Sequence, residues 1–144
     1  MKTDRSVNIA VYSDDSTVRA SIRSALGKAI SEDISIKEII DFATASALRL
    51  YVDSKKRVDL FILDGEAVPE GGMGVARQLK DEVFNCPPVL LITGRADDNW
   101  LATWSRAEGM VTHPIDPFNL AKKCAAILNA AQVNSANPAN TTVS

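Results

Sequence analysis

Short apolar runs alternate with segments of helical periodicity along most of this chain, and this alternation restricts the fold more than any other feature. Segments 60–63 and 89–92 are wholly apolar, which is typical of strands that are covered on both faces. Val18, Ile22 and Leu26 instead recur at four-residue spacing, as on one face of an amphipathic helix. Five strand-helix pairs in strict order predict an α/β fold of three layers, a parallel sheet with helices on both faces.

The expected elements follow from these patterns and from helix-boundary residues. Ser16 is predicted to cap the first helix, Gly27 to end it, and Asp116 with Pro117 to begin the last one. The predicted strands are 7–12, 34–40, 60–63, 89–92 and 110–111. The predicted helices are 16–26, 43–52, 75–83, a segment that carries Trp100 and Trp104, and the segment that follows Asp116.

Length and composition limit the class of protein. The 144 residues suffice for one domain with a core of its own, with 46% apolar and 24% charged residues. We expect one domain at 1–131 and, at 132–144, a disordered tail or the start of a linker rich in Asn, Ser, Thr and Pro. After residue 128 too few residues remain for a second domain, so the chain is either a stand-alone domain or the front of a longer one.

Charge and cysteine content exclude several kinds of partner. A net charge of -2 argues against direct nucleic-acid binding. No apolar run is long enough to span a bilayer, and the N-terminus is polar without a signal-peptide core. Cys86 and Cys124 have neither zinc-ligand nor disulfide-framework spacing. We therefore expect a cytoplasmic domain that contacts no membrane.

Polar residues stand where the predicted strands end. Asp14 and Asp15 follow the first strand, Asp64 the third, Thr93 the fourth and His113 the fifth. In open parallel sheets, function collects at the carboxyl ends of the strands. These five residues are therefore the candidate site.

Four segments in this order resemble the receiver domain of two-component response regulators. They are 12–19, 61–64, 91–94 and 113–117, which read YSDDSTVR, FILD, LITG and HPIDP. The resemblance extends over about residues 7–128. It implies a flavodoxin-like (βα)5 fold with parallel strand order 2-1-3-4-5.

The resemblance also implies a role for each candidate residue. Asp64 matches the aspartate that accepts a phosphoryl group from a histidine kinase or phosphotransfer protein. Thr93 matches the hydroxyl that contacts the phosphoryl group, and His113 stands where receivers carry a lysine. Mg²⁺ would be bound by Asp64 with Asp14 or Asp15, since it prefers oxygen ligands. Such a domain is a phosphoprotein in a phosphorelay and no enzyme beyond slow self-dephosphorylation.

Two departures from the receiver pattern bear on this prediction. Counting back from Arg19 without a gap places Ser13 and Asp14 at the family's acid pair, whereas a one-residue shift places Asp14 and Asp15 there. We favour the gapless alignment, which leaves one carboxylate fewer, so that Mg²⁺ binds weakly or not at all. An imidazole at position 113 is shorter than lysine and changes its charge near neutral pH.

The resemblance leaves two functions open. The first is a receiver that relays phosphorylation of Asp64 to a downstream protein or output domain, through the face made by the Trp100 segment, the fifth strand and the last helix. The second is a degenerate receiver that binds partners without phosphorylation. Trp100 and Trp104 lie one helical turn apart and are either core residues or anchors of an interface, including one with a second copy of the chain. A flavin-binding enzyme is disfavoured because no phosphate-cradling loop follows the first strand.

Overall fold

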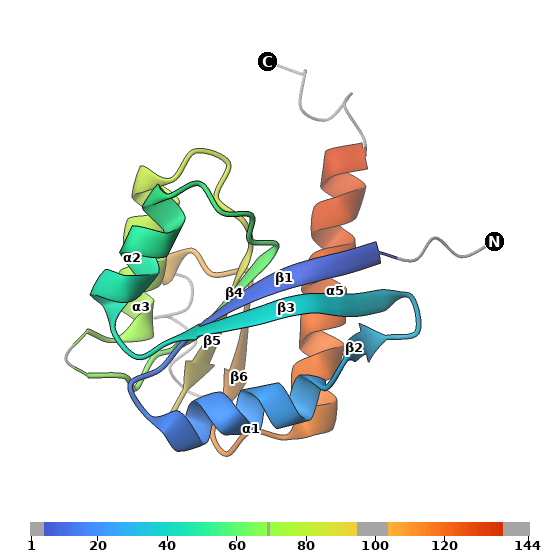
Figure 1. Cartoon of the computed structure of the whole chain (residues 1–144), viewed down its shortest axis with the longest axis horizontal. Helices are drawn as coiled ribbons and strands as arrows, with labels where there is room; N and C mark the ends of the chain where they lie inside the picture. The colour runs from blue at the N-terminus through green and yellow to red at the C-terminus, as the bar shows by residue number, and fades with distance from the viewer. Residues whose placement is uncertain (1–4, 69, 95–103, 137–144) are drawn as a thin grey trace.

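The computed structural model describes residues 5–68, 70–94 and 104–136, and these form one sheet with helices on both faces (Figure 1). Among the described residues the sheet has six strands, in the order β2-β3-β1-β4-β5-β6. In chain order the elements are β1 (Arg5–Tyr12), α1 (Ser16–Leu26), β2 (Ala29–Ser31), β3 (Ile34–Phe42), α2 (Ala45–Asp53), β4 (Leu60–Asp64), α3 (Gly72–Glu82), β5 (Val89–Thr93), β6 (Gly109–Thr112) and α5 (Pro117–Ala136).

The predicted topology is confirmed, with one strand added. The neighbours β3-β1-β4-β5-β6 all pair in parallel, and counting these strands alone in chain order gives 2-1-3-4-5. The added strand, β2, pairs antiparallel with β3 at the edge of the sheet. The sequence did not predict it because it is short and only its Ile30 is buried, so it has no alternating pattern.

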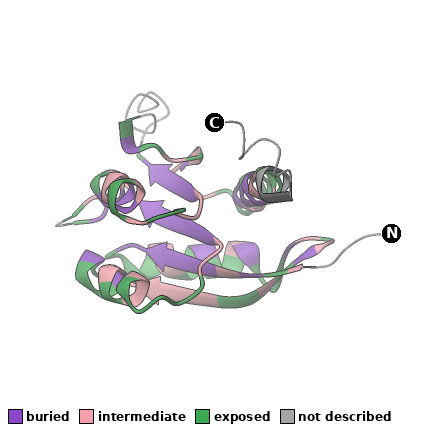
Figure 2. Ribbon diagram, turned by 90° about the horizontal axis from the view of Figure 1, so that it is seen from above, coloured by how far each residue is buried: buried purple, intermediate pink, exposed green. Residues whose placement is uncertain are grey.

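Two apolar cores cover the two faces of the sheet, and the ribbon of Figure 2 shows the central strands mostly as buried. In β4, Leu60 and Ile62 point into the core under α1 and α5, and Phe61 and Leu63 into the core under α2 and α3. The strands β1 and β5 divide their side chains between the cores in the same alternating way. Because both faces are buried, these strands are continuous apolar runs in the sequence.

The boundary residues of two helices agree largely with the sequence patterns. Helix α1 starts at Ser16, but its cap is Asp15, whose Oδ1 accepts a hydrogen bond of 2.9 Å from the Thr17 amide. Gly27 ends α1 with a φ of 59°, which favours glycine. Asp116 caps α5 as predicted, accepting at 3.1 Å from the Phe118 amide.

The predicted limits of two other helices were wrong. Helix α3 begins at Gly72, three residues before the predicted start at Val75. A Cβ on Gly72 would lie 2.7 Å from the backbone carbonyl of Asp64, so glycine at this position lets the start of α3 pack closely against the end of β4. Helix α5 continues to Ala136, so residues 132–136 are helical and not the tail that the sequence indicated. Between Pro117 and Pro138 the sequence contains no glycine or proline that would end the helix.

Other predictions fall on parts of the chain that lie outside the described residues. One is the predicted helix that carries Trp100, most of which falls within 95–103, and the other is the last eight positions, 137–144. Within the described ranges, no helix is both long and apolar enough to cross a membrane.

The core under α5 predicts how the two thiols react. Cys124 is fully buried, and burial raises the pKa of its thiol to about 12. Cys86 is only half-buried, although burial also raises its pKa. With Ellman's reagent at pH 8 we expect Cys86 to react in the native protein and Cys124 at least about a hundredfold more slowly, until denaturant is added. The Cys86→Ser variant isolates Cys124, and rapid labelling of its native state would contradict this packing.

Candidate functional site

The residues singled out by sequence gather at the carboxyl edge of the sheet. Asp64 is the last residue of β4 and Thr93 the last of β5. Ser13 directly follows β1 and His113 directly follows β6. The backbone fixes these positions, since the His113 amide donates to the Thr93 carbonyl at 2.8 Å.

The carboxylate of Asp64 is buried and held by three donors. The Ser13 hydroxyl donates to its Oδ2 at 2.8 Å, and the Glu66 amide donates to its Oδ1 at 2.9 Å. His113 Nε2 lies 3.3 Å from the same Oδ1. Only 3% of the Asp64 side chain is exposed. A carboxylate this buried requires such partners, because burying an unpaired ion costs several kcal/mol or more.

The geometry separates the two alignments of the first loop. Ser13 is fully buried and faces Asp64, whereas Asp15 is exposed and caps α1. The Asp15 amide donates to Ser13 Oγ at 3.1 Å, so Asp15 contacts the site through its backbone. This arrangement favours Ser13 and Asp14 at the family's acid pair.

Asp14 and Asp64 hold the same loop, residues 65–68. The Val68 amide donates to Asp14 Oδ1 at 3.2 Å, as the Glu66 amide does to Asp64. The described residues contain no cluster of three His, Cys, Asp or Glu side chains placed to hold a metal ion. Two carboxylates and a hydroxyl are nevertheless oxygen donors of the kind Mg²⁺ accepts while it keeps several waters. The donor set therefore fits a weak Mg²⁺ site.

The rest of this loop is tied to the sheet and to α2. The Tyr12 hydroxyl donates to the Glu70 carbonyl at 2.5 Å, and Arg49 forms a bidentate ion pair with the Glu70 carboxylate. Burial, and then the Glu70 carboxylate, raise the pKa of Tyr12. The Arg49 guanidinium lowers the pKa of Glu70. The loop between Asp64 and α3 is thus anchored at both ends.

Glu66 is a site residue that the sequence reasoning missed. A Cβ built on Gly94 would lie 3.1 Å from the Glu66 carboxylate, so this exposed acid reaches across the loop to the residue after Thr93. The available signal was its place two residues after Asp64, directly after Gly65.

The candidate interface residues are only partly within the described chain. Trp104 has 46% of its surface exposed, and the Arg77 guanidinium stacks 5.0 Å from its ring centroid. Trp104 is therefore not a core residue, whereas Trp100 lies outside the described residues. Met110 of β6 packs partly buried against the core under α2 and α3.

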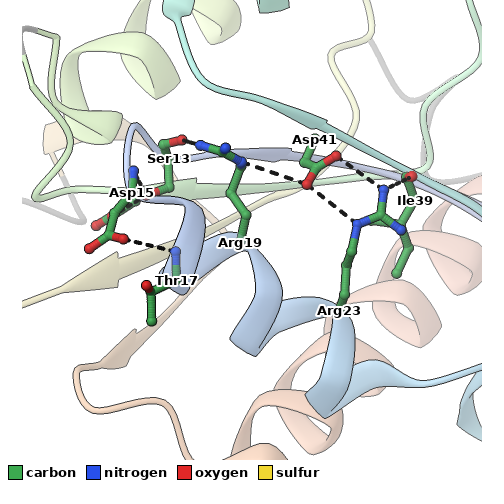
Figure 3. Close-up of polar contacts among 8 residues, drawn as sticks. Ser13, Asp15, Thr17, Arg19, Arg23, Ile39 and Asp41 are labelled. Atoms are coloured by element: carbon green, nitrogen blue, oxygen red, sulfur yellow. Dashed lines mark hydrogen bonds and ion pairs between the residues drawn. The ribbon is translucent and has the colours of Figure 1, made fainter.

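A second polar group lies behind Ser13, between α1 and β3 (Figure 3). Arg19 Nη1 donates to the Ser13 carbonyl at 2.6 Å, and Arg19 Nε lies 3.6 Å from Asp41 Oδ2. One turn later, Arg23 binds the same Asp41 carboxylate at 3.1 Å and the Ile39 carbonyl at 2.7 Å. The hydrogen bond from Arg23 lowers the pKa of Asp41.

Comparison with known proteins identifies the class to which this fold belongs. No family model matches the chain. Among solved structures, a CheY-like receiver domain protein from Methanospirillum hungatei has a TM-score of 0.70 at 17% identity and covers 90% of this chain and 99% of its own. A response regulator receiver domain from Clostridium thermocellum has a TM-score of 0.72 at 22% identity, with 88% and 98% covered. The fold is thus that of receiver domains.

Sequence relatives define the family. Two uncharacterized response regulatory proteins of Mycobacterium tuberculosis, MT3230 of strain CDC 1551 / Oshkosh and Rv3143 of strain H37Rv, are each 47% identical over 124 residues. The match covers 86% of this chain and 92% of each relative. The chain therefore belongs to the response regulators, as a receiver domain of two-component signalling.

The Arg23–Asp41 pair predicts a pH dependence of stability. A carboxyl whose pKa is lowered in the folded state stabilises the protein above its unfolded value, about 3.9, and this stabilisation is lost as the pH falls through the lowered folded value. The pair is partly exposed, at 47% for Arg23 and 29% for Asp41, so Arg23→Ala should cost about 0.3–1 kcal/mol at pH 7. Urea unfolding should show this difference shrinking at acid pH to what the Arg23 hydrogen bond to the Ile39 carbonyl contributes. In the Asp41→Asn background the difference should not change with pH, and a pH dependence there would contradict the assignment.

The acid pair predicts how Mg²⁺ affects stability. In chelator, Ser13→Asp should lower the free energy of unfolding by about 1–3 kcal/mol, because a second carboxylate replaces the hydroxyl that donates to Asp64. Millimolar Mg²⁺ should restore most of this loss and should stabilise the variant more than the wild type. Urea unfolding with and without Mg²⁺ measures both effects.

Asp15→Asn is the matched control, since asparagine also caps helices. Its response to Mg²⁺ should equal that of the wild type. A lost response would make Asp15 a metal ligand and favour the shifted alignment.

Proposed function

We propose that Asp64 accepts a phosphoryl group from a histidine kinase or a phosphotransfer protein, and that the domain passes this state to a downstream protein or output domain. The observation that carries the proposal is the Asp64 carboxylate, buried at the end of β4 between Ser13 and His113. Thr93, the last residue of the adjacent strand, is paired in register with the strand that leads to His113.

The chemistry is a transfer between two nucleophiles. A carboxylate oxygen of Asp64 attacks the phosphorus of a phosphohistidine, and a P–O bond forms as the P–N bond breaks and the imidazole leaves. The transferred group carries negative charge on its oxygens, so catalysis is mainly positioning and charge stabilisation. The site supplies the Glu66 amide, the Ser13 hydroxyl and His113 as donors around Asp64. We assign the domain no enzymatic activity beyond slow hydrolysis of its own phosphoaspartate.

In this proposal Asp14 and Asp64 would hold Mg²⁺ through their carboxylate oxygens. When bound, it would offset charge on the phosphoryl oxygens. The chain's own residues prepare this site by fixing loop 65–68 between the two carboxylates.

Thr93 and His113 are the residues proposed to respond to phosphorylation. Both lie at the carboxyl edge beside Asp64, and the His113 amide is bonded to the Thr93 carbonyl. A movement of either one is therefore transmitted to β6 and to the start of α5. That face, together with Trp104, is the proposed relay surface, with a downstream protein or a second copy as the partner.

A second candidate function is a receiver that binds its partner without phosphorylation. Two observations favour it: Ser13 replaces one acid of the pair, and Asp64 is nearly inaccessible with both oxygens already bonded. In this case the Asp64 hydrogen bonds serve to hold the loop, and the surface binds its partner while Asp64 is unphosphorylated.

Beryllium fluoride and acetyl phosphate distinguish the two functions. If Asp64 is a phosphoacceptor, beryllium fluoride with Mg²⁺ should shift amide signals of Glu66, Thr93 and His113 in an NMR spectrum, and acetyl phosphate should add one phosphoryl group by intact mass. Asp64→Asn should abolish both responses while it keeps the fold. Unchanged spectra and mass at millimolar reagent would reject phosphorylation and leave the binding module.

A further inference from the structure

Arg19 joins the candidate site to the edge of the sheet. Its guanidinium lies between the Ser13 carbonyl, at 2.6 Å, and the Asp41 carboxylate of β3, at 3.6 Å (Figure 3). Its side chain is largely buried, with 19% exposed. The charge-assisted hydrogen bond to Ser13 is therefore partly shielded from water.

Ser13 is held by its backbone and its side chain at once. Its amide donates to the Phe42 carbonyl at 3.1 Å, and its carbonyl accepts from Arg19. Its hydroxyl accepts from the Asp15 amide and donates to Asp64 Oδ2. The aim of the hydroxyl at Asp64 thus depends on a backbone that Arg19 holds in place.

We propose that Arg19 is a positioning residue for Asp64, acting through Ser13: it fixes the peptide group between Ser13 and Asp14 and so keeps the Ser13 hydroxyl on the Asp64 carboxylate. The reactivity assigned to Asp64 rests on the proposed function, but the hydrogen-bond geometry does not.

Asp41 completes the device. It binds both Arg19 and Arg23 and holds the Arg19 guanidinium against β3. The positive charge that faces Ser13 is therefore offset on its other side, which lets Arg19 act as an oriented donor beside an anionic site.

Arg23 provides a matched control from the same helix. It binds the same Asp41 carboxylate, but its other partner is the Ile39 carbonyl, which is not part of the site. Arg19→Ala and Arg23→Ala each remove one arginine from Asp41. Only Arg19→Ala removes a hydrogen bond to Ser13.

The experiment compares these two variants by beryllium fluoride titration with Mg²⁺ and by NMR of the untreated protein. Arg19→Ala should weaken the beryllium fluoride affinity about tenfold, the effect expected for one charge-assisted hydrogen bond. Arg23→Ala should change it less than about twofold. In the untreated protein, Arg19→Ala alone should shift the Asp64 carboxyl carbon and the Asp15 amide, which report the two hydrogen bonds of Ser13 Oγ. Arg19→Lys, which keeps a donor, should recover part of both signals.

A double substitution tests the route through Ser13. In the Ser13→Ala background, Arg19→Ala should weaken beryllium fluoride binding by less than about threefold, because the hydroxyl that Arg19 positions is already absent. Equal losses in Arg19→Ala and Arg23→Ala, or a full tenfold loss in the Ser13→Ala background, would overturn the proposal. A dispersed amide spectrum for each variant shows that it is folded, and Arg19→Lys replaces Arg19→Ala if the latter is not.

The two proposals fail in different ways. If the wild type does not bind beryllium fluoride, the phosphoacceptor function fails, and the Asp64 and Asp15 signals of the untreated protein still decide the role of Arg19. If the wild type binds it and those signals do not move in Arg19→Ala, the positioning role fails alone.

Discussion

A carboxylate at the end of a wholly buried strand is the constraint on which the rest of the site depends. β4 is buried along its whole length, with one core on each face, and it ends in the charged Asp64. The charge is tolerated because Ser13, Glu66 and His113 place hydrogen-bonding groups around it. Each of these groups has its own support, from Arg19 behind Ser13 to the backbone bond between His113 and Thr93.

The same constraint shapes the chain after β4. Loop 65–68 must turn at once to bring the Glu66 amide to Asp64, and α3 must start close against the strand end, where a side chain on Gly72 would collide with the Asp64 carbonyl. Tyr12 and Arg49 then fasten Glu70 at the far end of the loop. Hydrogen bonds and close packing therefore fix the conformation of this loop as part of the site.

The sequence predicted the parts of this molecule that depend on periodicity. The five parallel strands and the start of α5 follow from apolar runs and an Asp-Pro boundary, and the candidate residues meet at one edge because parallel strands end there. It missed β2, the cap at Asp15 and the start of α3 at Gly72, because these depend on local hydrogen bonds and close contacts that leave no periodic pattern in the sequence. The sequence also did not predict which residues hydrogen-bond to Asp64. Whether Ser13 or Asp15 faces it is a matter of one residue in a loop, which only the three-dimensional packing decides.

The two departures from the receiver pattern act on the same electrostatic balance. If Ser13 and His113 stand at the acid-pair and lysine positions, as the resemblance implies, the pocket lacks one negative charge and one fixed positive charge of the family pattern. When the imidazole is neutral, the formal charge beside Asp64 is the same as in the family pattern. Ser13 also turns an acceptor into a donor, so that Asp64 gains a hydrogen bond of 2.8 Å where another carboxylate would repel it. Ser13 and His113 therefore have opposite effects on the net charge beside Asp64. Their effects on Asp64 have to be measured together, because removing either one alone changes a charge that the other offsets.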